Sequence, residues 1–292
     1  MRVGIAILPE YRWRQAAEKW RAAEEYGFHH AWTMDHLGWR SLVDGPWVGA
    51  VPTLTAAATV TSRIRLGTFV ASPNFRHPVP FARELMAVDD ISDGRFTLGV
   101  GAGGGGYDST VMGGEDLAPV AKHARFTEFV TLLDALLTGE RTTFRGEYFT
   151  AVEARNAPGC VQRPRLPFVI AANGPKGMRL AAKLGAGWAT TGGPWRGGDT
   201  DGMDQWWGSV AAVVRKFDET VAAQGVQRFL QLDAAPAYVL SSMEFFADTL
   251  GRAAELGFTD VVAPWPRAEG IFAGDESVLE RVASDVLPTL EV

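Results

Sequence analysis

The feature of this 292-residue sequence that most restricts its fold is an alternation of short apolar runs with amphipathic segments. Helical spacing in those segments is clearest at Phe126, Phe129, Val130, Leu133, Leu136 and Leu137. The apolar runs have strand length and cover residues 2–8, 30–34, 64–71, 95–100, 167–172, 187–191, 229–240 and 258–264. Apolar strands separated by helices favour parallel pairing. Eight such units predict an α/β fold, a single (β/α)8 TIM barrel over residues 1–292 with insertion loops at its C-terminal face. An open, doubly wound sheet is the alternative.

One stretch departs from the alternation. About 28 residues follow the fourth predicted helix without a regular pattern, and within them TFRGEYFTA (143–151) predicts a small hairpin that turns at Arg145 and Gly146. The remaining helices are expected near residues 13–23, 53–61, 81–91, 178–182, 205–223, 246–254 and 276–286.

Composition restricts the partners. The formal net charge is -6, and no run of Lys or Arg stands out, so we expect neither a nucleic acid nor an acidic membrane as partner, but a small molecule. No apolar stretch approaches the length of a membrane span, and the first residues do not resemble a signal peptide, which predicts a cytoplasmic protein. The single cysteine, Cys160, cannot form an internal disulfide and is interpreted as a packed side chain.

Familiar catalytic signatures are missing from the sequence. The five histidines show neither H-x-x-x-H nor HExxH spacing, so we expect no metal site. There is no G-x-S-x-G motif to support a serine triad.

The segment AWTMDHL (31–37) is an apolar strand that ends in two titratable residues, Asp35 and His36. Asp35 could cap a following helix, and His36 could lie exposed in a turn. In a barrel, however, the residues that follow the C-terminal ends of the strands form the active face. The position of this pair therefore favours a functional role.

A run of glycines follows the fourth predicted strand in LGVGAGGGGYD (98–108). Gly99, Gly101 and Gly104 match G-x-G-x-x-G, but the run does not open directly into a helix, as a dinucleotide site requires. Two interpretations remain: a loop without a ligand, or a loop whose backbone a flat ring can approach closely because no side chains obstruct it.

The segment IAANGPKG (170–177) leads from the fifth strand directly into a helix. Backbone N–H groups at a helix start attract anions, and Lys176 and Arg179 add positive charge, so a phosphate would fit there. A helix start with nothing bound is the alternative. Thr190, Thr191 and Gly192 follow the next strand, and one or two of several tryptophans after strands two and six are candidates for the wall of a ring-binding cavity: Trp39, Trp47, Trp195, Trp206 and Trp207.

Five segments together resemble the bacterial luciferase-like superfamily, and within it the branch that uses the deazaflavin coenzyme F420. They are the strand ending in Asp35-His36, RIRLGTFVASPNFRHP (63–78), ISDGRFTLGVGAG (91–103), PFVIAANGPKGMRLAAKLGAGWATTG (167–192) and LGFTDVVAPWPR (256–267). The resemblance runs over nearly the whole chain. It implies a (β/α)8 barrel, a homodimer, and a flavin-type ring across the C-terminal mouth.

The resemblance also implies roles for individual residues. Asp35 would touch the polar edge of the ring, and His36 would face its reactive centre. The other cofactor-binding residues implied are Phe69 and Val70 in a bulged, often cis, peptide behind the ring, Ser72 at the rim, and Ala172, Asn173, Gly174, Pro175, Thr191 and Gly192 near the ribityl chain and phosphate. Gly101 in the glycine run and Lys176 at the helix start complete the predicted binding set.

Two departures from the family pattern are visible. Some deazaflavin sugar dehydrogenases carry a glutamate proton donor in the glycine loop, where this chain has only Gly103–Gly106. A lysine near the phosphate in some relatives is also missing, and Lys176 or Arg196 is a candidate replacement.

The predicted reaction is a hydride transfer between F420 and a small organic substrate, with the His36 imidazole moving the accompanying proton. An FMN-dependent monooxygenase that uses O2 is one alternative. A catalytically silent flavin-binding barrel or scaffold is the second.

Overall fold

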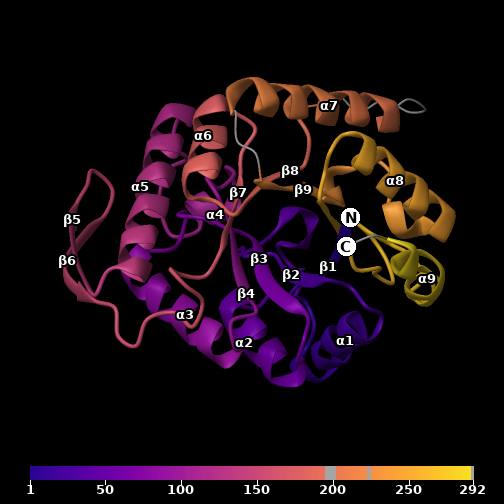
Figure 1. The fold of residues 1–292 in the computed structure, drawn as a ribbon, viewed down its shortest axis with the longest axis horizontal. Coiled ribbons are helices and arrows are strands. Elements are labelled where there is room, and N and C mark those ends of the chain that lie inside the picture. The colour runs from indigo at the N-terminus through magenta and orange to yellow at the C-terminus, as the bar shows by residue number, and fades with distance from the viewer. Residues whose placement is uncertain (195–201, 222–224, 291–292) are drawn as a thin grey trace. The chain divides into compact units, whose positions relative to one another are not determined.

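The structure is a computed structural model that describes residues 1–194, 202–221 and 225–290 (Figure 1). Trp195 and Arg196, which the sequence suggests as a ring-binding wall and a phosphate ligand, lie outside the described residues.

Eight strands close into a parallel barrel. Around the barrel the order is β1-β10-β9-β8-β7-β4-β3-β2, and the strands are β1 (Arg2–Ala6), β2 (His30–Thr33), β3 (Arg65–Ala71), β4 (Phe96–Gly101), β7 (Phe168–Ala171), β8 (Gly187–Thr190), β9 (Gln227–Gln231) and β10 (Asp260–Pro264). The predicted (β/α)8 barrel is confirmed, and the open sheet is wrong. Each apolar run lies at or within about two residues of its strand, except that the run 229–240 gives only the short β9 before two 3-10 turns around Pro236.

The helices alternate with these strands. They are α1 (Trp13–Glu25), α2 (Ala50–Val60), α3 (Pro78–Ile91), α5 (Pro119–Thr138), α6 (Pro175–Leu184), α7 (Gly202–Thr220), α8 (Met243–Glu255) and α9 (Ser277–Arg281). The last predicted helix, 276–286, is helical over this range, as α9 over Ser277–Arg281 and as a π-helix over Val282–Val286. A 3-10 turn over Leu287–Thr289 follows it, with Pro288 in its first positions.

The chain carries insertions at three places: after β2, after β4 and before β7. Long loops follow β2 (residues 34–49) and β4 (102–118), and the second contains a short helix, α4 (Tyr107–Thr110), that the sequence did not predict. The predicted hairpin is β5 (Arg141–Arg145) with β6 (Thr150–Arg155), and it lies between α5 and β7. Its turn is held by Glu128 of α5, whose carboxylate accepts hydrogen bonds from the backbone of Glu147 and Tyr148 at 2.9 and 3.0 Å.

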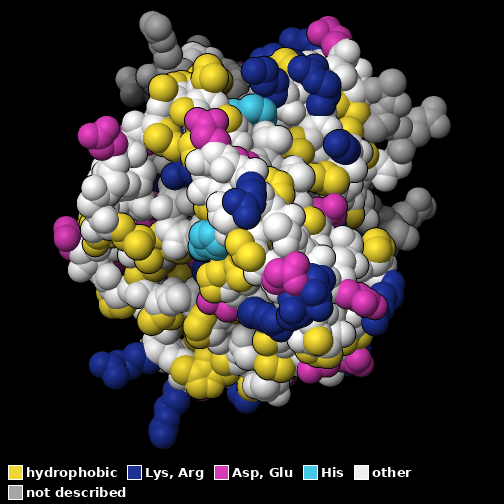
Figure 2. All heavy atoms as spheres, turned by 90° about the vertical axis from the view of Figure 1, so that its left-hand side faces the viewer, with side chains coloured by type: hydrophobic (Ala, Val, Ile, Leu, Met, Phe, Trp, Pro, Cys, Tyr) yellow, Lys and Arg dark blue, Asp and Glu magenta, His cyan; other side chains and the backbone are white. Residues whose placement is uncertain are grey.

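Contacts divide the chain into two compact units. One contains residues 1–8, 19–32 and 170–292, and the other contains 9–18 and 33–169. The expectation of a single domain over 1–292 stays a prediction. No helix among the described residues is long and apolar enough to span a bilayer. On the face over α5 and the β5–β6 hairpin, charged side chains of both signs are interspersed with apolar ones (Figure 2).

A buried ionic network joins the first residues of three strands in the first unit. Asp260 at the start of β10 accepts a hydrogen bond from Arg2 of β1 at 2.6 Å, and its other oxygen lies 3.1 Å from His30 Nε2 on β2. The Trp32 indole N–H donates to His30 Nδ1 at 2.6 Å. Gly4 leaves the space that the His30 ring fills, since a Cβ there would lie 1.8 Å from His30 Nδ1. This network marks the N-terminal ends of the strands.

Candidate functional site

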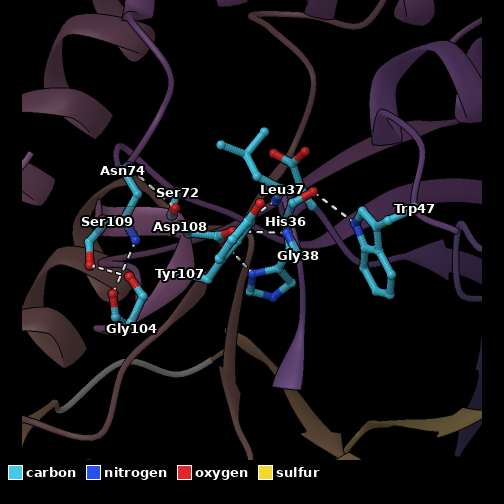
Figure 3. Close-up of polar contacts among 12 residues, drawn as sticks. His36, Leu37, Gly38, Trp47, Ser72, Asn74, Gly104, Tyr107, Asp108 and Ser109 are labelled. Carbon is cyan, nitrogen blue, oxygen red and sulfur yellow. Dashed lines mark hydrogen bonds and ion pairs between the residues drawn. The ribbon is translucent and has the colours of Figure 1, made fainter. Parts of the chain in front are cut away.

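The strand β2 ends at Thr33, and the chain after it carries Asp35 and His36 into the long loop. The His36 imidazole points toward the carboxylate of Asp108 on α4, and Nδ1 lies 2.5 Å from Oδ2 (Figure 3). The second carboxylate oxygen of Asp108 accepts hydrogen bonds from the backbone N–H groups of Leu37 and Gly38, at 2.8 and 3.3 Å. One side chain thus fixes both the imidazole and the backbone beside it.

The neighbours of Asp108 lower its pKa. Burial alone raises the pKa of Asp108, but the hydrogen bond and charge of His36 and the two backbone donors outweigh it, so the pKa lies below its ordinary value. In the neutral form of His36, an ionised Asp108 accepts the Nδ1–H, and that tautomer leaves the lone pair on Nε2. No group in the described ranges lies within hydrogen-bond distance of Nε2, and the His36 side chain is 29% exposed.

Two tryptophans flank His36. The Trp47 indole N–H donates to the His36 carbonyl oxygen at 2.8 Å, and its ring lies edge-on to the imidazole with centroids 6.4 Å apart. Trp39 lies 6.3 Å from the imidazole on a tilted plane and stacks on Trp47. His36 is therefore held by an acid on one side and by aromatic rings on the other.

Asp35 is buried, and both of its oxygens are engaged. Arg76, in the loop after β3, donates to them from Nε at 2.6 Å and from Nη2 at 2.8 Å. A third contact joins Arg76 to Glu84 of α3 at 3.1 Å. Burial alone lowers the pKa of Arg76. The hydrogen bonds to Asp35 and the charges of Asp35 and Glu84 raise this pKa by more, so the guanidinium stays charged. The predicted contact of Asp35 with a ring edge stays a prediction, now with Arg76 as a second candidate for that edge.

The strand β3 bulges at the predicted position. The Phe69–Val70 peptide is cis, and the register with β4 shifts between Thr68 and Ala71. Gly99 of β4 allows this approach, because a Cβ there would lie 2.0 Å from the Thr68 carbonyl oxygen. Ser72 is buried directly after the strand, and Gly101 is the last residue of β4.

Two glycines in the loop after β4 lie too close to neighbouring side chains to carry a Cβ atom. A Cβ at Gly103 would lie 2.6 Å from the Asn74 side chain, and one at Gly105 would lie 2.1 Å from Asp116. Gly104 and Gly106 have no atom within 4 Å of an added Cβ. The interpretation that a ring approaches this backbone therefore applies to Gly104 and Gly106.

In the first unit, the loops after β7 and β8 are tied together by Asn173. Its Nδ2 donates to the Gly192 carbonyl oxygen at 2.7 Å, and its Oδ1 accepts from the Thr190 hydroxyl at 2.6 Å. The Trp188 indole donates to the Ala172 carbonyl oxygen at 2.7 Å, and the Trp206 indole donates to the Thr191 carbonyl oxygen at 3.0 Å. The predicted residues of these two loops are thus brought together by direct hydrogen bonds.

The start of α6 has the properties of an anion site. Gly174 precedes the helix with no atom within 4 Å of an added Cβ, and Pro175 occupies the first turn. Lys176 and Arg179 are exposed. Open backbone N–H groups, the helix dipole and two cations fit the phosphate of a coenzyme.

The sequence did not reveal Asp108 or Arg76 as residues of the site, and it did not reveal that Trp47 donates a hydrogen bond to the His36 carbonyl oxygen. Asp108 is the first acid after the glycine run, and Arg76 lies five residues after Ala71, within a segment that carries the family resemblance. Among the described residues, no group of three or more His, Cys, Asp or Glu is placed to hold a metal ion.

Known relatives place the chain in a family. The model of the luciferase-like monooxygenase family matches residues 1–263. An F420-dependent glucose-6-phosphate dehydrogenase of Beutenbergia cavernae is 31% identical over 318 residues, which cover 92% of this chain and 90% of that protein. A protein of the same name from Nakamurella multipartita is 37% identical over 183 residues, and the match spans 50% of its length.

Solved structures show the same fold at lower identity. A monooxygenase from Streptomyces bottropensis superposes with a TM-score of 0.78 at 20% identity, covering 99% of each chain. The coenzyme F420-dependent tetrahydromethanopterin reductase of Methanopyrus kandleri gives 0.75 at 17% identity, again over 99% of each chain. With the family model matching most of the sequence, this protein belongs to the luciferase-like monooxygenase family.

Proposed function

We propose that this protein is an F420-dependent oxidoreductase that transfers a hydride between the coenzyme and a small organic substrate. Its relative in Beutenbergia cavernae, similar over nearly the whole chain, carries F420 dependence in its name. The observation that carries the mechanism is the His36–Asp108 pair at the end of β2, because it presents an oriented and partly exposed imidazole where the chemistry is expected.

One group of residues in this proposal transfers the proton, and the others bind the coenzyme. His36 takes or returns the substrate proton at Nε2, while Asp108 holds Nδ1–H and stabilises the imidazolium that forms. The ion pair of Asp35 with Arg76 would hold the polar edge of the coenzyme ring, and Phe69, Val70, Ser72 and Gly101, at the neighbouring strand ends, would hold the rest of the ring. The ribityl chain and phosphate would be held by Ala172, Asn173, Gly174, Pro175, Lys176, Thr191 and Gly192. When bound, F420 supplies a carbon that accepts or donates the hydride.

A titration of the apoprotein with F420 and with FMN, followed by fluorescence, tests this proposal. We expect F420 to bind at least about tenfold more tightly, which is roughly 1.4 kcal/mol. The reverse order would move the protein to the FMN-dependent monooxygenases. If neither ligand binds at micromolar concentration, the catalytically silent scaffold replaces the proposal.

The homodimer and the cytoplasmic location stay predictions of the family resemblance and of composition. Light scattering coupled to size-exclusion chromatography measures the first. Fractionation of cells that express the tagged chain measures the second.

A further inference from the structure

Arg125 of α5 is a partly buried cation with fewer partners than its burial requires. Its Nη2 donates to Asn74 Oδ1 at 2.6 Å, whereas its Nε is buried with no hydrogen-bond partner in the structure. Within the described ranges no carboxylate forms an ion pair with it, and Asp116, whose charge acts on it, is paired with Lys122 at 3.0 Å. Burial lowers the pKa of Arg125, and Tyr148 and Asp116 oppose this only in part.

Other arginines of the same unit show how such burial is usually compensated. Arg76 has two carboxylate partners. Arg95 donates to five oxygen acceptors, four of them backbone carbonyls. Arg165 pairs with Asp134 and donates to a carbonyl oxygen. A buried charge normally has partners of this kind because its desolvation is costly. Arg125 lacks them, which points to a ligand.

The hydrogen bond to Asn74 holds Arg125 next to the loop that directly follows β3. The Asn74 amide donates from Nδ2 to the Gly104 carbonyl oxygen at 3.1 Å while its Oδ1 receives Arg125. Gly104 lies in the loop after β4, four residues before Asp108. Figure 3 shows Asn74 and Gly104 beside Tyr107 and Asp108, in the same cluster as His36. Arg125 is thus tethered to the loops that carry the proton-transfer pair.

We propose that Arg125 recognises an anionic oxygen group, a phosphate or a carboxylate, on the substrate that reacts at His36. The planar guanidinium matches two oxygens of such a group at once, and Asn74 fixes its orientation in advance. The inference rests on the proposed function for the identity of the reaction and adds the chemical class of the substrate.

The test is a calorimetric titration of inorganic phosphate into the protein, with and without saturating F420, for the wild type and three variants. Arg125→Met removes the charge, Arg125→Lys keeps the charge without the fork, and Arg141→Met removes an exposed arginine paired with Glu153 on the hairpin. F420 affinity is measured separately by fluorescence. We expect Arg125→Met to weaken phosphate binding at least tenfold and Arg125→Lys about threefold or more, with Arg141→Met unchanged and the F420 affinity of all variants preserved.

With saturating F420, which occupies the phosphate site proposed at the start of α6, two outcomes would overturn the inference: no phosphate binding to the wild type, or equal binding by the wild type and Arg125→Met. Phosphate binding that depends on Arg125 only in the absence of F420 would also overturn it, because it would assign Arg125 to the coenzyme. If Arg125→Met does not fold, as judged by circular dichroism, unchanged phosphate binding by Arg125→Lys overturns it instead. Failure of F420 to bind while phosphate binding still depends on Arg125 would refute the proposed coenzyme and leave the anion site standing.

Discussion

His36 and Asp108 are 72 positions apart in the chain, and the chemistry of each depends on the other. Without Asp108, nothing in the described residues would select the Nδ1–H form of the imidazole. Without His36, Asp108 would keep only the two backbone donors of Leu37 and Gly38. The pair resembles in its logic the acid–histidine arrangement of other enzymes, in which the acid orients the base.

At this residue scale we expect His36→Ala to lower kcat by about 10² to 10⁴ and to change F420 affinity much less, because the imidazole acts on the substrate proton. Asp108→Asn should lower kcat by about 10- to 100-fold and alter the pH profile of kcat, since the neutral amide stabilises the imidazolium less. Steady-state kinetics from pH 5 to 9 with a substrate found by screening measures both. Loss of F420 binding in His36→Ala, with kcat intact at saturating coenzyme, would assign His36 to the coenzyme instead.

The Asp35–Arg76 ion pair makes a second prediction for single residues. Arg76→Met leaves the buried Asp35 carboxylate without its cation, at a cost of about 3–5 kcal/mol, whereas Asp35→Ala leaves Arg76 paired with Glu84 alone, so both variants should lower the unfolding temperature and weaken F420 binding, Arg76→Met the more in stability. The double variant should recover stability relative to the single ones. If Asp35→Ala binds F420 poorly while Arg76→Met binds it as the wild type does, Asp35 contacts the ring directly and Arg76 is dispensable for it.

At the scale of elements, α6 begins shortly after a strand of the barrel ends, and no side chain caps the backbone N–H groups of its first turn. Pro175 has no N–H to lose at this position, and Gly174 leaves the approach open. The cations are a separate contribution, because Lys176 and Arg179 are exposed and lie one turn apart.

We expect Lys176→Ala with Arg179→Ala to weaken F420 binding by about tenfold and to leave binding of the same deazaflavin ring system without its phosphate nearly unchanged. Lys183→Ala, an exposed lysine in the last turn of the same helix, is the matched control. Fluorescence titration with both ligands gives the comparison. Equal weakening for the two ligands would show that this helix start is not the phosphate site.

At the scale of the whole molecule, stability depends on the network at the N-terminal ends of β1, β2 and β10. Burial raises the pKa of Asp260, but the hydrogen bond and charge of His30, together with Arg2 and Thr259, lower it below the ordinary value of 3.8. A carboxylate with a lowered pKa binds its proton more readily in the unfolded chain. It therefore stabilises the fold fully above about pH 4, and this stabilisation is lost as the pH falls through the folded pKa.

Asp260→Asn should accordingly reduce the free energy of unfolding by about 3 kcal/mol at pH 7 and flatten the loss of stability below pH 4. Asp218→Asn, which removes a half-exposed partner of Arg228, should change stability by less than about 1 kcal/mol and keep the acid limb of the wild type. Urea unfolding at several pH values measures both. An acid limb that is the same in Asp260→Asn and the wild type would show that other carboxylates dominate it.

The sequence by itself determined the barrel, the helix start at 174–177 and the position of Asp35 and His36 at a strand end. These features are encoded locally, because the spacing of apolar residues sets the element type, and the alternation of elements restricts the topology. The irregular parts were less predictable. A glycine-rich run such as 103–106 has few local preferences, so the short helix α4 after it depends on contacts made elsewhere.

Only the tertiary structure decided which charged groups meet. Asp108 could have paired with any cation that the loop path allows, and its choice of His36 follows from the way α4 packs beside Gly38, where an added Cβ would lie 2.9 Å from the Tyr107 ring. Arg76 and Arg125 look alike in the sequence, yet one is compensated by two carboxylates and the other only by Asn74. The contacts Asp35–Arg76, Asn74–Arg125 and His36–Asp108 join residues 41 to 72 positions apart. No local pattern records them, because ionic contacts depend on distances that exist only once the strands have closed and the loops have packed.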